Sequence, residues 1–158
     1  MALSKTSILG IIFFLAFVVQ FLFKLNWEWL FQLQQQEMYK RWTGLLLAIF
    51  VLFQWLLSLV RTVKSLKKFA VNMQEIHKWL GAISPLLFYT HSIRLGYGYL
   101  LLLSYFFLAN TVLGYFNLDV IKKSGEIYFK GWMIAHVALS LIITILMVFH
   151  VTMVFYYK

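Results

Sequence analysis

Two stretches of equal length, each bounded by histidines, decide the expected fold. They are HKWLGAISPLLFYTH from His77 to His91 and HVALSLIITILMVFH from His136 to His150. These four are the only histidines in the chain, and each pair is separated by fourteen positions. In an α-helix, fourteen residues return a side chain to within about 40° of its starting face, about 21 Å further along. Each stretch, if helical, therefore presents two imidazoles on one side, one near each edge of a hydrocarbon core about 30 Å thick.

The composition indicates an integral membrane protein. Of the 158 residues, 63% are hydrophobic and 12% are charged, whereas a soluble domain is about 45–50% apolar and about 25% charged. The absence of cysteine excludes disulfides, thiolate metal sites, Cys-ligated iron–sulfur clusters and covalent c-type haem. The net charge of +9 suits cationic residues that flank spans and face anionic lipid, so a lipid bilayer is the expected partner rather than nucleic acid.

Hydropathy predicts an all-α protein with five transmembrane helices. They are expected at about residues 7–23, 43–60, 75–94, 99–116 and 131–156. The first stretch is longer than the apolar region of a typical signal peptide, which favours a retained span over a cleaved leader. Residues 24–42, rich in tryptophan and glutamine, predict a short interfacial helix, with a partner-docking loop as the alternative. Pro85 should kink the third span, and the LGYG sequence at 95–98 predicts a tight reversal.

The expected organisation is a two-span hairpin at residues 1–70, with a basic cytoplasmic end, followed by a three-span unit at 71–158 that carries the histidines. Five spans place the two termini on opposite sides. The N-terminal side collects Lys5, Arg61, Lys64, Lys67, Lys68, Lys78, Lys122, Lys123 and Lys130, and the other side Lys24, Lys40, Arg41, Arg94 and Lys158. The excess of Lys and Arg on the N-terminal side predicts that the N-terminus is inside and the C-terminus outside. The membrane is expected to be a bacterial cytoplasmic membrane.

The order of the spans predicts how the histidines pair. One span separates the two His-bearing spans, so these should run parallel. His77 then lies level with His136 near the cytoplasmic face, and His91 lies level with His150 near the outer face. Two imidazoles at each level, with no thiolate or evident carboxylate, suit haem iron, whose other four ligands come from the macrocycle. Zinc or copper would need further ligands. The prediction is two b-type haems, and the alternative is a set of structural histidines.

Other residues on the same helices are candidates for contact with haem. Gly81 and Ser140 each lie four residues beyond the inner histidine of their helix, where a small side chain would admit a flat macrocycle; Leu95 occupies that position beyond His91. Lys78 and Arg94 lie at the heights where haem propionates need cationic partners. Each candidate also has an ordinary explanation, helix packing for the small residues and snorkelling anchors for the cations. The side chains expected to fill the space between the two levels are Phe88, Ile143 and Met147.

This pattern resembles the ferric-reductase-like transmembrane domain of the cytochrome b superfamily, in which two parallel spans each carry a His pair of about this spacing. HKWLG at 77–81 is similar to the family's His-basic-x-x-Gly, and Trp132, four residues before His136, is similar to its aromatic-x-x-x-His opening. The resemblance covers about residues 70–158. The respiratory-chain cytochrome b core has a similar two-haem plan and remains an alternative.

The resemblance implies a membrane subunit that carries electrons across the bilayer, between a partner or quinol on one side and an acceptor on the other. NADPH oxidases and ferric reductases add a sixth span and a flavin domain, whereas this chain stops about two turns after His150 and holds no Gly-rich nucleotide motif. We therefore expect other subunits of a redox complex as partners, with quinone as a further candidate. The alternatives are a stand-alone reductase of metal ions or quinone, and a non-redox membrane scaffold.

Overall fold

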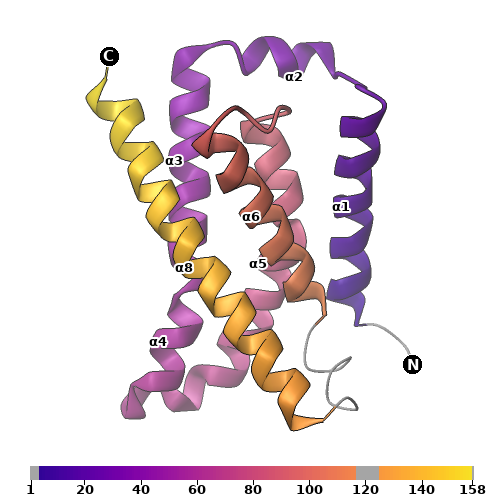
Figure 1. The fold of residues 1–158 in the computed structure, drawn as a ribbon. Coiled ribbons are helices and arrows are strands. Elements are labelled where there is room, and N and C mark those ends of the chain that lie inside the picture. The colour runs from indigo at the N-terminus through magenta and orange to yellow at the C-terminus, as the bar shows by residue number, and fades with distance from the viewer. Residues whose placement is uncertain (1–3, 117–124, 158) are drawn as a thin grey trace.

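The computed structural model describes residues 4–116 and 125–157, and within these residues it contains helices and turns but no strand. In chain order the elements are α1 (Lys5–Leu22), α2 (Glu28–Leu33), α3 (Glu37–Gln54), α4 (Leu56–Thr62), the 3-10 helix η1 (Lys64–Phe69), α5 (Ala70–His91), α6 (Tyr99–Tyr115) and α8 (Glu126–Tyr156). Figure 1 shows that α1, α5 and α8 run in one direction, that α3 and α6 run in the other, and that α2 lies across one end of the bundle.

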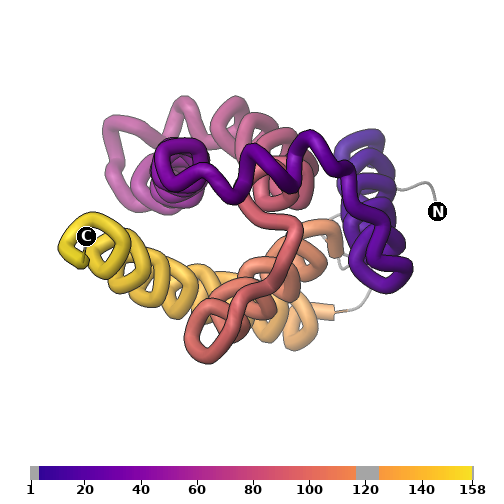
Figure 2. The backbone as a smooth tube through the Cα atoms, turned by 90° about the horizontal axis from the view of Figure 1, so that it is seen from above, coloured from indigo at the N-terminus to yellow at the C-terminus, as the bar shows by residue number. Residues whose placement is uncertain are grey.

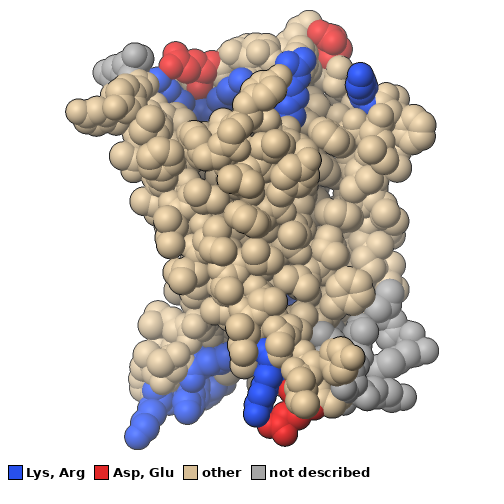
Figure 3. Space-filling view, in the orientation of Figure 1, with Lys and Arg blue, Asp and Glu red and all other residues tan. Residues whose placement is uncertain are grey.

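Three helical stretches are long and apolar enough to cross a membrane: α1, the continuous stretch Glu37–Thr62 that joins α3 to α4, and α8. The apolar helix α6 is one residue short of that length, at 17 residues. The face seen in Figure 3 carries its Lys, Arg, Asp and Glu side chains at the two ends, with an uncharged belt between them. The length and composition of these helices and the uncharged belt on the surface therefore support the prediction of an all-helical membrane protein. By length and composition, three of the five predicted spans are candidates to cross a membrane.

Helix α5, which carries the first His pair, is not among those three because its sequence includes Asn, Gln, Glu and Lys as well as the histidines. Its position explains how it tolerates them. It packs against α1, α3, α4 and α6, and Figure 2 shows α1 and the C-terminal end of α8 on opposite sides of the bundle. The polar side chains lie in its first half, next to η1, where Asn72 and Glu75 are exposed, whereas the buried residues of α5 all belong to its second half.

The fully buried Pro85 lies inside α5, and the local structure compensates for its missing N–H. The carbonyl that Pro85 would have paired with is that of Gly81, four residues earlier. The Ser84 hydroxyl donates to this carbonyl at 2.8 Å. In apolar surroundings an unpaired carbonyl would be costly, so this hydrogen bond lets the helix continue to His91.

Several predicted boundaries shift. Helix α5 ends at His91 instead of Arg94, so Leu95 lies in the turn after the helix, where it is buried. Helix α8 begins at Glu126, about five residues before the predicted span. Residues 117–124, which precede it in the predicted loop, lie outside the described residues. The reversal after α5 is as predicted, with Gly96 and Gly98 at φ values of 79° and 58° that favour glycine.

The two predicted units share one hydrophobic core. Helix α1 packs against α5 and α6, and α3 packs against α5 and α8. The core cluster is Phe17, Phe88, Leu95, Phe107 and Ile143. Its aromatic centre is formed by Phe88, whose ring is stacked on Phe107 at 5.4 Å and is edge-on to Phe17 at 5.6 Å. The residues expected between the two histidine levels, Phe88, Ile143 and Met147, are all buried.

Candidate functional site

The two His-bearing helices are held apart at the level of the first pair. Helix α5 packs on α3 and α6, and α8 packs on the same two helices, but α5 and α8 are not closely packed on each other. A cavity of about 380 Å³ is lined by residues of both helices and of α3, α4, α6 and the start of α1. His77 and His136 both line it. This volume falls in the range of about 300–1,000 Å³ that is usual for small-molecule and cofactor sites.

The imidazoles of His77 and His136 face each other across this region. Their ring centroids are 6.1 Å apart, and their planes meet at 79°. Metal–nitrogen bonds of about 2 Å on either side of one ion, plus the half-width of each ring, place two trans imidazole centres about 6–6.5 Å apart. The pair therefore has the separation that two axial ligands of one metal would have.

The nitrogen atoms of this pair are distinguished by their surroundings. The Nδ1 atoms of His77 and His136 are buried and make no hydrogen bond to any described residue. The backbones of Gln54 and Asn110 lie near these two rings and interact with them electrostatically. Because both rings line the cavity, the nitrogen that each has available there is Nε2. Coordination through one ring nitrogen, with the other directed at a backbone carbonyl, is the usual arrangement of a metal-binding histidine.

The two small residues predicted for this level both line the cavity. A Cβ atom added at Gly81 would meet no neighbour within 4 Å, so there is open space beside α5. The Ser140 hydroxyl donates to the carbonyl of His136 at 2.8 Å and accepts from the Asn110 side-chain amide at 2.9 Å. Its polar atom is therefore satisfied within the protein, and the residue presents little bulk to the cavity.

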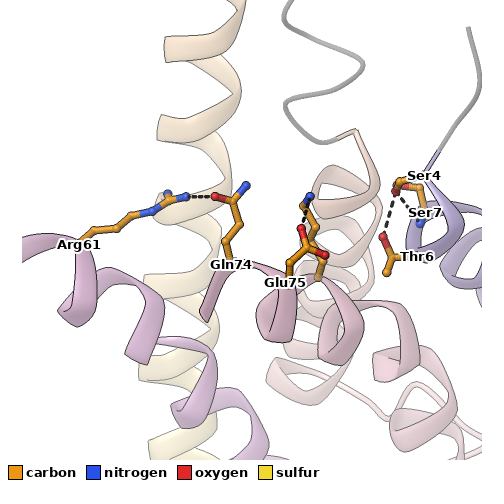
Figure 4. Close-up of polar contacts among 7 residues, drawn as sticks. Ser4, Thr6, Ser7, Arg61, Gln74 and Glu75 are labelled. Carbon is orange, nitrogen blue, oxygen red and sulfur yellow. Dashed lines mark hydrogen bonds and ion pairs between the residues drawn. The ribbon is translucent and has the colours of Figure 1, made fainter. Parts of the chain in front are cut away.

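Two cationic residues line the cavity, Arg61 from α4 and Lys78 from α5. Lys78, predicted from the sequence, lines the cavity and forms an ion pair of 3.1 Å with Glu75. Arg61, which the sequence reasoning did not single out, also lines it and donates to Gln74 Oε1 at 2.9 Å, as Figure 4 shows. The cavity thus combines a largely apolar lining with two cations, a combination that suits a flat apolar ligand with carboxylates on one edge.

An aromatic stack fixes the position of His136 on α8. The indole of Trp132 lies parallel to the His136 ring, at 5.7 Å between centroids and 5° between planes. The ring of Phe129 is in turn stacked against Trp132, with the centroids 6.0 Å apart. The Trp132 Nε1–H donates to the carbonyl of Leu113 at 2.7 Å, which ties the indole to α6. Gly114 on α6 also lies beside this ring, since a Cβ added there would be in ordinary contact with His136 Cε1, at 3.5 Å.

The second pair lies at the other end of α5 and α8, about 21 Å further along each helix. His91 and His150 are close enough to interact electrostatically. Each is held by a hydroxyl group: the Oγ1 of Thr43 lies 3.2 Å from Nδ1 of His91, and the Oη of Tyr99 lies 3.4 Å from Nδ1 of His150. At this level too, Nε2 is the nitrogen without a hydrogen bond to a described residue.

Arg94 was predicted as a propionate partner at this second level. It is exposed, and its guanidinium lies over the ring of Phe31 at 5.1 Å from the centroid. The structure thus brings Lys78 to the inner cavity, whereas it engages Arg94 with α2. Among the described residues, no group of three or more His, Cys, Asp or Glu side chains could hold a metal ion.

The sequence reasoning missed the residues that support the histidines from other helices. Thr43 and Gly44 come from α3, Tyr99 begins α6, and Arg61 belongs to α4. The prediction had considered neighbours only on the two helices that carry histidines. The one signal available in the sequence is Gly44, which stands beside Thr43 just inside the second predicted span.

Comparison with protein-family models, curated proteins and solved structures finds no match for this chain.

Proposed function

We propose that this protein is a di-haem b-type cytochrome of the membrane that carries electrons from one face of the bilayer to the other. The observation that carries the proposal is the inner site. There, α3 and α6 hold two parallel His-bearing helices apart around a cavity of about 380 Å³, and the two imidazoles lie 6.1 Å apart. The second pair, His91 and His150, lies at the other end of the same two helices, where the two rings interact electrostatically.

At the inner level, His77 and His136 would hold the iron through Nε2. Gly81 and Ser140 leave room for the macrocycle, and Trp132 keeps the ring of His136 in one orientation. Arg61 and Lys78 would bind the propionates, because two cations that line an apolar cavity favour carboxylates there. At the outer level, His91 and His150 are the corresponding ligands.

Haem iron, when bound between these imidazoles, supplies one-electron chemistry that no side chain of the protein provides. The protein contributes the ligands, the apolar surroundings and the nearby charges. Phe88, Phe107 and Ile143 form a buried core between the two levels, which excludes water from the path between the two sites. An electron that moves between the levels crosses the apolar thickness of the bundle.

In this proposal all five long helical stretches span the membrane. Helix α5 does so in spite of its polar residues because these lie in its first half, next to the basic helix η1 at one end of the bundle. The basic residues of α4 and η1, Arg61, Lys64, Lys67 and Lys68, lie at the end of the bundle nearest His77, which favours a cytoplasmic location for that end. The N-terminus is then inside and the C-terminus outside. The donor is a partner subunit of a redox complex or a quinol.

The deciding experiment is a reduced-minus-oxidised optical spectrum of the purified protein, with haem measured per chain. We expect sharp b-type bands and two haems per chain. Absence of these bands after expression with an adequate haem supply would refute the proposal and leave a non-redox membrane scaffold. A protein that carries two haems and oxidises quinol without any partner would replace the subunit role with that of a stand-alone enzyme.

A further inference from the structure

The two histidine levels differ in what holds the Nδ1 side of each ring. At the inner level both Nδ1 atoms are buried without a hydrogen bond to a described residue. At the outer level, Thr43 approaches His91 and Tyr99 approaches His150. We propose that Thr43 is a positioning residue that fixes the tautomer and the orientation of His91, so that Nε2 is the nitrogen available for iron. This inference rests on the proposed function and adds a control of the outer site by α3.

The direction of the hydrogen bond follows from the other bond that Thr43 makes. The Thr43 hydroxyl has one proton, and it lies 2.7 Å from the carbonyl of Tyr39, four residues earlier on the same helix. A carbonyl can only accept, so the proton belongs to that bond. Toward His91, Thr43 Oγ1 is therefore the acceptor, and Nδ1 of His91 is the donor. A neutral imidazole with its proton on Nδ1 has its lone pair on Nε2.

Gly44 adds a steric restraint next to this hydrogen bond. A Cβ atom at Gly44 would lie 2.8 Å from Cε1 of His91 and 3.4 Å from Nδ1. The ring therefore lies directly against the backbone of α3, closer than any other residue type at position 44 would allow. His91 is also the last residue of α5, so it depends on contacts from outside its own helix for a fixed orientation. Thr43 and Gly44 supply both an acceptor and a surface.

The chain from His91 through Thr43 to the carbonyl of Tyr39 has an electronic consequence. A histidine that donates its free N–H to an acceptor becomes a more basic ligand. A more basic axial ligand stabilises the oxidised iron, which lowers the reduction potential of the outer haem. Removing the acceptor should therefore raise that potential and leave the inner haem unchanged, because the inner histidines have no contact with Thr43.

The test uses Thr43→Val and Thr43→Ser in the full chain, with Thr152→Val as the control. Thr152 makes the same bond to the carbonyl four residues earlier, at 2.8 Å, but it is exposed. Potentiometric titration and electron paramagnetic resonance would follow each haem, and His91→Ala would identify the outer one. We expect Thr43→Val to raise the midpoint potential of the outer haem or to remove that haem selectively, and we expect Thr43→Ser to restore the wild-type values.

Three outcomes would overturn the inference while leaving the proposed function in place. They are an unchanged outer haem in Thr43→Val, an equal change in both haems, and a Thr43→Ser variant that behaves like Thr43→Val. A wild-type protein without haem would instead refute the proposed function itself. The serine variant also separates a hydrogen-bond effect from misfolding, since it keeps the hydroxyl and removes only a methyl group.

Discussion

Gln34 and Ile93 are joined by a hydrogen bond in which the backbone N–H of Ile93 donates to Gln34 Oε1 at 2.9 Å. The same side chain donates from Nε2 to the carbonyls of Tyr89 and Thr90, at 2.8 Å and 3.1 Å. A single buried glutamine after α2 therefore satisfies three backbone groups at the end of α5, immediately around His91. This relationship connects the surface helix α2 to the proposed outer site.

The first prediction concerns this connection. Replacing Gln34 with Ala removes the partner of the Ile93 N–H and the side-chain donor to the Tyr89 carbonyl, whereas the Thr90 carbonyl still accepts from the Tyr39 hydroxyl. Each buried group left without a partner typically costs about 1–3 kcal/mol. We expect a lower thermal unfolding temperature in detergent and a weaker outer haem. Gln35→Ala is the control, because Gln35 is exposed and bonds only to its own helix. Equal stability of the two variants would contradict the role assigned to Gln34.

A second prediction compares two glycines that face histidines. In Gly44→Ala the new methyl group would lie 2.8 Å from His91 Cε1, whereas in Gly114→Ala it would lie at an ordinary 3.5 Å from His136 Cε1. Overpacking typically costs about 1–3 kcal/mol, so Gly44→Ala should weaken the outer haem by about tenfold and Gly114→Ala should be tolerated. Haem transfer to an apo-globin acceptor measures both. The opposite order of effects would show that α3 does not hold His91.

The third prediction tests whether a cation that lines the inner cavity helps to hold the inner haem. Arg61→Gln removes a positive charge that lines the cavity. Lys64→Gln is the control, because it removes a positive charge from the neighbouring 3-10 helix η1, none of whose residues lines the cavity. We expect Arg61→Gln to accelerate loss of the inner haem by roughly threefold to tenfold, as expected for a lost charge-assisted contact near solvent. Lys64→Gln should leave the rate unchanged. Identical rates in the two variants would remove Arg61 from the propionate site.

The orientation in the membrane can be tested because the chain contains no cysteine. A single cysteine at Ser65, in the basic 3-10 helix, should be protected from a membrane-impermeant maleimide in intact cells and labelled after permeabilisation. A cysteine at Tyr97, which is 87% exposed in the turn after α5, should be labelled in both conditions. The reverse pattern would invert the proposed topology and exchange the inner and outer haems.

The sequence predicts the helical class and the direction of its helices well, because both follow from local patterns. Long apolar runs indicate spans, and the single helix between the two His-bearing ones makes these parallel. The sequence is less informative about α5, whose composition is too polar for a lipid-facing span. Its central place depends on contacts with four other helices, and such contacts leave no periodic signal in the sequence of α5 itself.

The candidate site divides in the same way. The four predicted residues of the inner level follow helical spacing on two helices, so the sequence alone predicts that they face one cavity: His77, Gly81, His136 and Ser140. The support for His91 comes instead from Thr43, more than forty residues away, and its role depends on a register between α3 and α5 that is set by packing. The end of α5 also depends on another element, since Gln34 binds the backbone groups on either side of His91.

The last prediction concerns the pairing of the histidines. If each level holds one haem, His77→Ala and His136→Ala should both remove the inner haem, and His91→Ala and His150→Ala should both remove the outer one. Each single variant should keep about half of the haem, because the levels are about 21 Å apart and share no ligand. Imidazole added to His77→Ala should restore the inner signal, since the deleted ring leaves a space of its own size beside the cavity. Haem quantification with optical spectra of all four variants checks the pattern, and a variant that loses both haems or neither, with the protein still folded, would refute the assignment of ligands to levels.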